Sequence, residues 1–268
     1  MFFLFISSVF KGVSITTGGT ITNSLFLECE NPIYCDNSAL SVSVSYCCFG
    51  ACFGYSMVRM VRGNSCTVEY SGFVNCNGSD SILSPRYRTR YEYIRYTSVS
   101  ESSAYWFGTV LGATVEEEYK FNNHTSSYGR CVAGLDIGEN MAPHNITFND
   151  FVNLTGSGTI CTYSTSGTFN GAYMNFINNR NDHLIGRYAS RAGIFALSSC
   201  VFIGNTYQDY LYAKLTDCYE DNNGSIPALN SVPQATVCKL PSVEFTMQKD
   251  SSLLYVLVLA WFLSCAEM

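Results

Sequence analysis

Two short stretches, MNFINN at 174–179 and CVFIGN at 200–205, decide the fold of this 268-residue chain. Each places a phenylalanine three residues before an asparagine, and the two phenylalanines, Phe176 and Phe202, are 26 residues apart. Self-similarity at a period of roughly 20–50 residues is typical of repeat architectures. The two stretches therefore indicate a repeated structural unit.

The same pattern continues upstream along the chain. An aromatic residue followed by turn-forming residues recurs at steps of 23 to 30 residues. The eight anchors of this pattern are Phe26, Phe49, Phe73, Tyr96, Phe121, Phe151, Phe176 and Phe202, and a shorter copy follows at Cys218-Tyr219. Short runs typical of β-strands flank each anchor, and the residues between them are Gly, Asn, Asp and Ser, which favour turns.

A repeat of roughly 24 residues with two or three short strands and no helix predicts one coil of a β-solenoid. We expect an all-β parallel β-helix of about eight coils, with a short apolar helix only at the C-terminus. Stacking would place equivalent residues about 4.8 Å apart. The anchor aromatics should form an inward column, and the residue three positions later should also point inward at a turn.

The composition agrees with a stacked architecture. The chain is 47% hydrophobic and 15% aromatic, which supplies a substantial core, but only 13% charged. Identical charges stacked on successive coils would repel one another, so a solenoid favours uncharged polar residues. The formal net charge is −6, whereas a protein that follows nucleic-acid phosphates needs an excess of basic residues. We expect no nucleic-acid partner.

The thirteen cysteines favour a secretory route. Cys29, Cys52 and Cys76 fall at one position of three successive coils, and Cys131 and Cys161 share another position. We interpret them as interior thiol columns, buried as small hydrophobic side chains, although disulfides between coils also satisfy the distance. The densest cysteine cluster, at 47–52, has no histidine nearby, so we expect no metal and no other cofactor.

The chain resembles the right-handed parallel β-helix proteins of the pectate-lyase-like superfamily. Its Phe-x-x-Asn copies and the Gly-Thr-Ile stretches at 19–21 and 158–160 are similar to the repeats of polymorphic outer-membrane proteins and related surface adhesins. The resemblance covers about residues 15–223 and departs from the Gly-Gly-Ala-Ile motif of that family, to which 18–21 is closest. It implies a right-handed single-stranded β-helix, a surface or secreted location and adhesion, with no catalytic residues.

Apolar segments at both ends suggest targeting. Residues 1–14 form a candidate signal peptide, with cleavage after Ser14, and the alternative is a first β-strand. The β-helix is expected over 15–223, a linker over 224–250 and an apolar C-terminal segment over 251–266. A helix of its fourteen apolar residues reaches about 21 Å, short of a ~30 Å hydrocarbon core. We nevertheless favour membrane attachment over a buried terminal helix or strand.

Five sequons permit N-glycosylation of a secreted chain: Asn77, Asn123, Asn145, Asn153 and Asn223. With 21 asparagines and 52 serines and threonines in 268 residues, chance alone gives about the same number, so the sequons do not establish secretion.

A basic stretch is the first candidate binding site. Arg86, Arg88 and Arg90 alternate along a predicted strand, with Tyr91 among the neighbouring tyrosines, and could bind an acidic glycan or a phosphate. Three glutamates, 116–118, follow about one coil later. A ladder of salt bridges between the two strips is the alternative that we favour.

Three residues form the candidate catalytic site. Asp182 and Asp209 follow their anchors at similar distances, so adjacent coils could bring them together, and His183 adjoins Asp182. Glycosidases and lyases use such clustered acids. Aspartate in a turn is ordinarily a turn former, however, and the sequence has no recognised hydrolase motif.

The sequence therefore favours a non-catalytic protein, secreted or attached to a membrane at the cell surface, that binds an extracellular protein or glycan. A carbohydrate-active enzyme of the pectate-lyase-like class and a degenerate repeat protein without independent activity are the alternatives. The fold makes one sharp prediction: Phe176 and Phe202 are adjacent and buried, and Asn179 lies beside Asn205.

Overall fold

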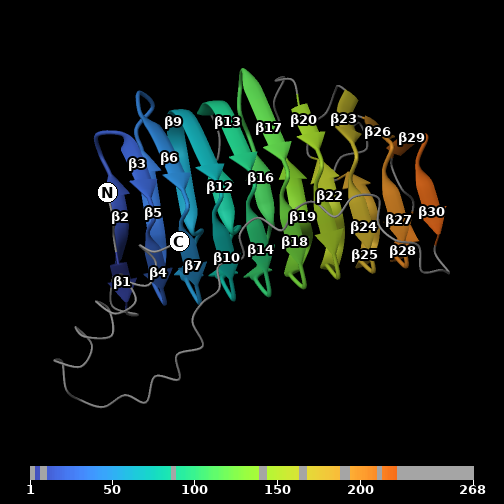
Figure 1. Cartoon of the computed structure of the whole chain (residues 1–268), viewed down its shortest axis with the longest axis horizontal. Helices are drawn as coiled ribbons and strands as arrows, with labels where there is room; N and C mark the ends of the chain where they lie inside the picture. The colour runs from blue at the N-terminus through green and yellow to red at the C-terminus, as the bar shows by residue number, and fades with distance from the viewer. Residues whose placement is uncertain are drawn as a thin grey trace, which may run out of the picture. The chain divides into compact units, whose positions relative to one another are not determined.

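The computed structural model describes residues 4–6, 11–85, 89–138, 144–162, 168–187, 194–209 and 213–221. The chain divides into two compact units, 1–238 and 239–268, and all described residues belong to the first. Its strands wind into coils that lie side by side in chain order (Figure 1), and every paired strand is parallel to its neighbour. The predicted all-β, right-handed parallel β-helix is confirmed.

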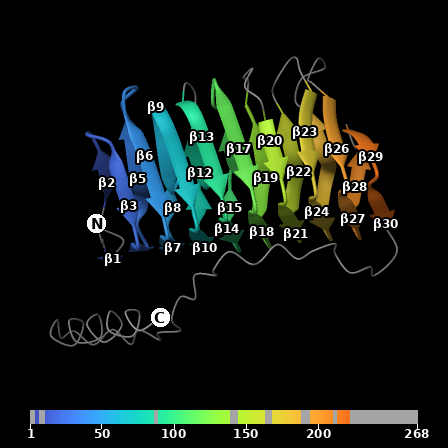
Figure 2. The ribbon, with the colours of Figure 1, turned by 45° about the horizontal axis from the view of Figure 1, so that its top comes forward.

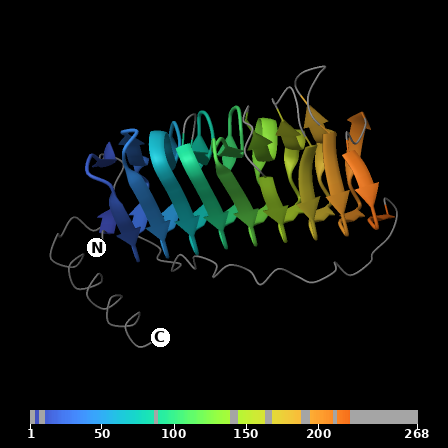
Figure 3. The same ribbon diagram turned by 90° about the horizontal axis from the view of Figure 1, so that it is seen from above.

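The first face of the solenoid is a ten-stranded sheet whose strands follow one another in chain order. Each strand has three residues, and the views in Figures 2 and 3 show the successive coils side by side. The strands are β1 (Leu4–Ile6), β4 (Leu25–Leu27), β7 (Cys48–Gly50), β10 (Gly72–Val74), β14 (Ser98–Ser100), β18 (Asn123–Thr125), β21 (Asp150–Val152), β24 (Asn175–Ile177), β27 (Val201–Ile203) and β30 (Tyr219–Asp221).

The second face follows the first face in each coil. Several coils divide it into two short strands, and later coils have one longer strand. Its strands are β2 (Lys11–Ile15), β5 (Glu30–Asp36), β8 (Phe53–Gly54), the first part of β9 (Val58–Glu69), β11 (Asn77–Gly78), β12 (Leu83–Pro85), β15 (Ser103–Ala104), β16 (Thr109–Leu111), β19 (Tyr128–Ile137), β22 (Thr155–Thr162), β25 (Arg180–Arg187) and β28 (Thr206–Asp209).

The third face returns the chain to the next coil, and β9 joins it to the second face because its two parts pair on both. Besides the second part of β9, its strands are β3 (Gly19–Thr22), β6 (Ser41–Ser45), β13 (Thr89–Arg95), β17 (Glu116–Lys120), β20 (His144–Thr147), β23 (Thr168–Ala172), β26 (Ile194–Ser198) and β29 (Ala213–Thr216).

The N-terminal segment contributes two strands to the solenoid. Strand β1 pairs with β4, which places Phe5 opposite Phe26, and β2 pairs with β5. Both strands overlap the candidate signal peptide at 1–14, whose cleavage stays a prediction. The linker at 224–250 and the apolar segment at 251–266 lie outside the described residues. In the part of the chain that is described, no helix has the length and apolarity needed to cross a bilayer.

The interior of the first face is an aromatic column. Phe176 and Phe202 are both buried, with ring centroids 4.8 Å apart and ring planes 5° from parallel. Phe26, Phe49 and Phe73 stack in the same way at 4.7 and 4.5 Å. The prediction for the decisive pair is confirmed.

Two of the predicted anchors, Tyr96 and Phe121, do not belong to this column. The strand register places Val99 and His124 between Phe73 and Phe151 instead. The choice of aromatic residues as anchors was wrong there because the interior position accepts a smaller apolar side chain and a buried histidine. With the register corrected, the steps between equivalent residues are 23 to 27 residues rather than 23 to 30.

Tyr96 and Phe121 instead belong to a second aromatic column, on the outside of the corner that precedes the first face. Its six rings stack in parallel, with successive centroid distances between 4.7 and 5.0 Å. The column consists of Tyr46, Tyr70, Tyr96, Phe121, Phe148 and Tyr173. We call it the outer aromatic column.

Every residue of the outer aromatic column has a left-handed backbone, with φ between 48° and 56°. This conformation costs about 1–2 kcal/mol for a residue with a Cβ. It also turns each amide towards the next coil, so that Tyr46 N–H donates to the carbonyl of Glu69 and Tyr70 N–H to that of Arg95. Ring stacking, worth about 0.5–1.5 kcal/mol per pair, offsets the backbone cost.

A second left-handed corner lies five residues later, at the end of the first face. Asn178 has a φ of 52° and Gly204, in the next coil, a φ of 61°. The residue that follows points inward. The side chain of Asn179 donates to the carboxamide oxygen of Asn205 at 3.0 Å and to the carbonyl of Phe151 at 2.9 Å, as expected for an asparagine column at a turn.

The cysteine columns are confirmed in one case and wrong in the other. Cys29, Cys52 and Cys76 are buried thiols at equivalent corners of successive coils. Cys131 and Cys161, by contrast, do not share a position, because the register places Cys161 opposite Asp136. The equal spacing was counted from Phe121, and the correct anchor, His124, already places Cys131 three residues out of alignment with Cys161. A bulge in β19 between Gly129 and Leu135 adds two more residues to the shift.

Two buried carboxyl groups lie on neighbouring strands inside the third face. Glu92 and Glu117 are register partners, and neither side chain is exposed. The amide of Gly112 donates to Glu92 Oε2 at 2.8 Å, and the buried thiol of Cys66 occupies the position opposite Glu92 on the other side. Burial raises the pKa of Glu92 well above its ordinary value, and the Glu117 carboxyl raises it further.

We predict that Glu92 makes the protein less stable at high pH. Its folded-state pKa is raised, so the folded protein retains a proton that the unfolded chain releases near pH 4.3. The free energy of unfolding should therefore fall by up to about 1.4 kcal/mol per pH unit above that value, until the folded-state pKa is passed. Urea unfolding between pH 4 and 9 measures this slope.

Glu92→Gln should remove this contribution, because glutamine is neutral and its carbonyl can still accept from Gly112. Glu116→Gln is the matched control, since Glu116 is exposed on the same face. Identical pH slopes for the wild type and Glu92→Gln would contradict the prediction.

We also predict that the outer aromatic column is stabilising. Tyr96→Ala removes two stacking contacts but keeps the left-handed backbone, so it should lower the free energy of unfolding by about 2 kcal/mol. Tyr96→Gly removes the same ring but relieves the backbone, and should be about 1 kcal/mol less destabilising than alanine. Urea unfolding followed by circular dichroism gives both values.

Ser199→Gly is the matched control, because Ser199 has the same left-handed φ of 52° but no ring. It should be neutral or stabilising. Equal destabilisation by Tyr96→Ala and Tyr96→Gly would show that backbone strain does not contribute.

Candidate functional site

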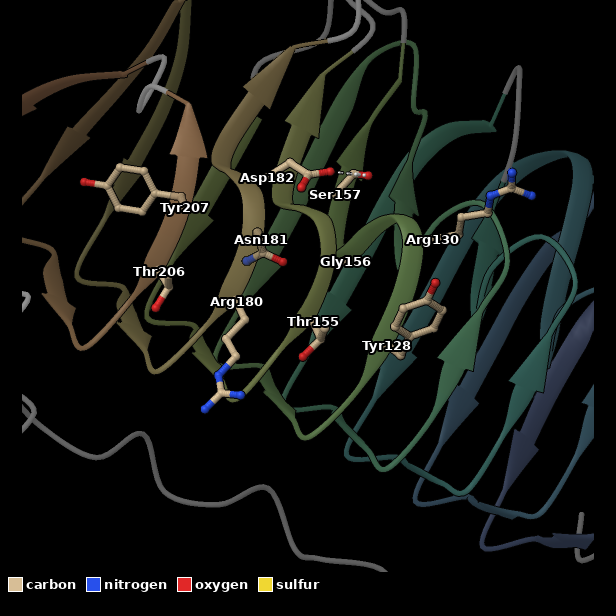
Figure 4. Close-up of a pocket in the computed structure, with 10 residues that line it drawn as sticks. All are labelled: Tyr128, Arg130, Thr155, Gly156, Ser157, Arg180, Asn181, Asp182, Thr206 and Tyr207. Carbon is tan, nitrogen blue, oxygen red and sulfur yellow. Dashed lines mark hydrogen bonds between the residues drawn. The ribbon is translucent and has the colours of Figure 1, made fainter.

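A shallow groove of about 690 Å³ crosses the outer surface of the second face over β19, β22, β25 and β28. Ten residues line it, and Figure 4 shows their side chains along these four neighbouring strands. They are Tyr128, Arg130, Thr155, Gly156, Ser157, Arg180, Asn181, Asp182, Thr206 and Tyr207. We call it the second-face groove.

Strand register builds the groove from one column of outward positions. Tyr128, Thr155, Arg180 and Thr206 are successive register partners, each four residues after the inward residue of its first-face strand. All four are exposed. Since the strands lie about 4.8 Å apart, the column offers polar and aromatic groups at a regular interval across the coils.

Gly156 permits close packing between coils beneath the groove. It lies at an inward position, opposite the buried Gly129 and Asn181. A Cβ at this position would collide with the carbonyl of Gly129 on the neighbouring coil, so glycine is required there.

Two arginines dominate the charge of the groove. The guanidinium of Arg130 lies 4.7 Å from the ring centroid of Tyr105 and 5.8 Å from that of Trp106. Arg180 is exposed on β25, between Thr155 and Thr206 (Figure 4). Within the described residues neither arginine forms an ion pair. Both guanidinium groups are consequently available to an anionic ligand.

Asp182 is the one carboxylate among the described residues that line the groove. The hydroxyl of Ser157, on the neighbouring coil, donates to Asp182 Oδ2 at 3.1 Å, as the dashed line in Figure 4 shows. With two arginines and one aspartate, the described lining has a formal charge of +1 in a chain of net charge −6.

The candidate catalytic residues do not all share one column. The register places Asp209 opposite His183, not opposite Asp182. Successive residues of a strand point to opposite faces, so Asp182 and Asp209 belong to different columns. The distances from the anchors are similar but not equal: Asp182 follows Phe176 by six residues and Asp209 follows Phe202 by seven, and this difference places them out of register.

The predicted basic strip is only partly within the described residues. Arg86 and Arg88 lie outside them, whereas Arg90 is exposed, with its guanidinium 5.3 Å from the ring centroid of Tyr91. The register places 116–118 opposite Tyr91, Glu92 and Tyr93 rather than opposite arginines.

Salt bridges do form beside this strip, from another arginine. Glu118 contacts Arg95 and also Lys120, at 3.1 Å, and Arg95 contacts Glu69 at 3.2 Å. A cross-coil ion network therefore exists, but the glutamates pair with residues that end their strands.

Sequence reasoning missed the arginines and tyrosines of the second-face groove. Tyr128 and Arg180 share one signal, a constant offset of four residues from the inward first-face residue, whereas Arg130 and Tyr207 do not have this offset. This offset is visible only when His124 replaces Phe121 as the anchor of its coil.

The described residues contain no group of three or more histidine, cysteine, aspartate and glutamate side chains placed to hold a metal ion. Comparisons find no protein-family model, no curated protein and no solved structure that matches this chain.

The sequons differ in accessibility. Asn77, Asn145 and Asn153 are exposed, whereas Asn123 is half-buried within β18, and Asn223 lies outside the described residues. The Asn123 carboxamide oxygen is buried and has no hydrogen-bond partner in the described structure.

We predict that Asn77, Asn145 and Asn153 accept glycans when the chain passes through a eukaryotic secretory pathway, and that Asn123 is modified least. Glycopeptide mass spectrometry after expression in secretory cells measures the occupancy of each site. Each Asn→Gln variant is the control for its own peptide, and occupancy of Asn123 equal to that of Asn153 would contradict the prediction.

Proposed function

We propose that the protein is a non-catalytic binding module, secreted or attached at the cell surface, that holds an extended anionic glycan in the second-face groove. The observation that supports this most directly is the pair of unpaired arginines in a groove that runs across successive coils. The location rests on the apolar ends and cysteine content of the sequence.

The shape of the groove favours a linear ligand. Its lining comes from four consecutive coils, and Thr155, Arg180 and Thr206 repeat at the strand spacing. A polymer that lies along the coils can use the same kind of contact on each one. Because each strand is hydrogen-bonded to its neighbours, the backbone that carries the binding groups is already ordered, and binding costs only side-chain freedom.

The charge of the groove favours an anionic group on that polymer. Arginine presents a planar fork of donors that matches carboxylate and sulfate oxygens. Arg130 is held by stacking on Tyr105, which limits the side-chain freedom that binding would cost. Because the protein as a whole is acidic, the rest of its surface repels anions, which favours binding of an anionic ligand in the basic groove.

A carbohydrate-active enzyme remains the second candidate, because Asp182 lies in the groove. Acid–base hydrolysis by the usual route needs a pair of carboxylates. Asp182 is the one carboxylate in the described lining, and its partner is the hydroxyl of Ser157. Binding without cleavage is therefore the function that we favour.

We predict that Arg130→Ala and Arg180→Ala each weaken binding of a sulfated or uronic-acid oligosaccharide by about tenfold or more, since a charge-assisted hydrogen bond contributes about 1.5–3 kcal/mol. Isothermal titration calorimetry with these two probes and a neutral oligosaccharide measures the affinities. Mass spectrometry of the recovered probe should show no cleavage.

Arg90→Ala is the matched control, because Arg90 is an exposed arginine outside the groove. Equal affinity in all three variants would place the ligand elsewhere. Cleavage of a probe that is lost in both Asp182→Asn and Asp209→Asn would establish the enzyme instead.

A further inference from the structure

We infer that the second-face groove continues onto the coil before β19, where Tyr105 and Trp106 form an aromatic subsite that stacks on the apolar face of a sugar ring. This inference rests on the proposed function and adds a second recognition element to it: a pyranose unit next to the anionic unit held by Arg130.

The two rings form a compact exposed pair. Tyr105 and Trp106 lie between β15 and β16, and their exposed fractions are 47% and 45%. The ring centroids are 4.9 Å apart, and the planes are perpendicular. A T-shaped pair is a stable arrangement that leaves ring surface open to a third partner.

The aromatic pair is continuous with the groove. Strand β15 is the register neighbour of β19, with Ser103 opposite Tyr128 and Ala104 opposite Gly129. Tyr105 follows Ala104 and Arg130 follows Gly129 in the sequence, and the side chains of Tyr105 and Arg130 are in contact. Arg130 thus belongs to both sites, as a groove residue and as the neighbour of both rings.

The backbone that presents the rings is fixed on both sides. The amide of Tyr105 donates to the carbonyl of Gly78 on the preceding coil at 2.9 Å, and the carbonyl of Trp106 accepts from Val132 on the following coil at 3.2 Å. The rings are therefore displayed from a rigid position, which reduces the entropy lost on binding.

A sugar is the partner whose chemistry matches both features. The C–H face of a pyranose ring is apolar and flat enough to stack on an indole, while its substituents can be anionic. Arg130 lies beside the rings, where it can bind a carboxylate or sulfate of the adjoining unit. From β15 to β28 the combined site covers four strand spacings, about 19 Å, a length suited to an oligosaccharide.

The test compares two ligand lengths against variants of Trp106. A disaccharide and a hexasaccharide of the same uronic-acid or sulfated series are titrated by calorimetry into the full chain, Trp106→Ala and Trp106→Phe. We expect Trp106→Ala to weaken both ligands by about tenfold and Trp106→Phe to weaken them less, because a disaccharide already spans the aromatic subsite and Arg130. Circular dichroism confirms that the variants are folded.

Two outcomes would overturn the inference, and they are distinguishable. If Arg180→Ala weakens the hexasaccharide but Trp106→Ala does not, the groove binds the ligand and the aromatic subsite is wrong. If the wild type binds neither series at any length, the proposed function fails and the subsite fails with it. If Trp106→Ala weakens the binding of the uronic-acid series alone, or of the sulfated series alone, the result supports the inference and identifies the anionic group.

Discussion

The structure depends on one constraint, the parallel hydrogen bonding of each coil to the next. Because every strand pairs with its equivalent about 4.8 Å away, each side chain lies above the side chain at the same position of its neighbour. A residue that suits this environment must tolerate a similar residue on both sides. Phenylalanine does so by stacking, as at Phe176 and Phe202, and asparagine by donating from Asn179 to Asn205. Glu92 above Glu117 satisfies the same geometry only if the pair retains a proton.

The constraint also explains how far the sequence could predict the fold. Where the stacked residues are alike, spacing alone located them, so the coils around Phe26, Phe49, Phe73, Phe176 and Phe202 were assigned correctly. Where the interior residue changes type, a stronger aromatic signal three residues earlier displaced the alignment to Tyr96 and Phe121. The anchor at Phe121 also misaligned Cys131 with Cys161, and the bulge in β19 increased their separation. Local spacing therefore predicted the architecture, but register depended on long-range backbone pairing.

The candidate site was less predictable because it departs from the stacking rule. Outward positions are free of the interior constraint, so Tyr128, Thr155, Arg180 and Thr206 differ from coil to coil although they share one column. A search for repeated residues cannot find such a column, since its members resemble one another in position and not in type. The predicted basic strip had the opposite character: it is an obvious local cluster, but the register places glutamates 116–118 opposite Tyr91, Glu92 and Tyr93 and not opposite its arginines.

The two left-handed corners have a consequence for how the chain could change length. Wherever both corners are described they are five residues apart, as at Tyr173 and Asn178, and the last residue of the third-face strand lies four residues before the inward first-face residue. Variation in coil length is therefore confined to the rest of the coil, which includes the second face with its bulge in β19 and the connection to the third face. Insertions in that connection would lengthen a loop, whereas one added residue near a corner would reverse the inward and outward sides of a strand. The connection between the second and third faces can therefore accept added residues, whereas the two left-handed corners cannot.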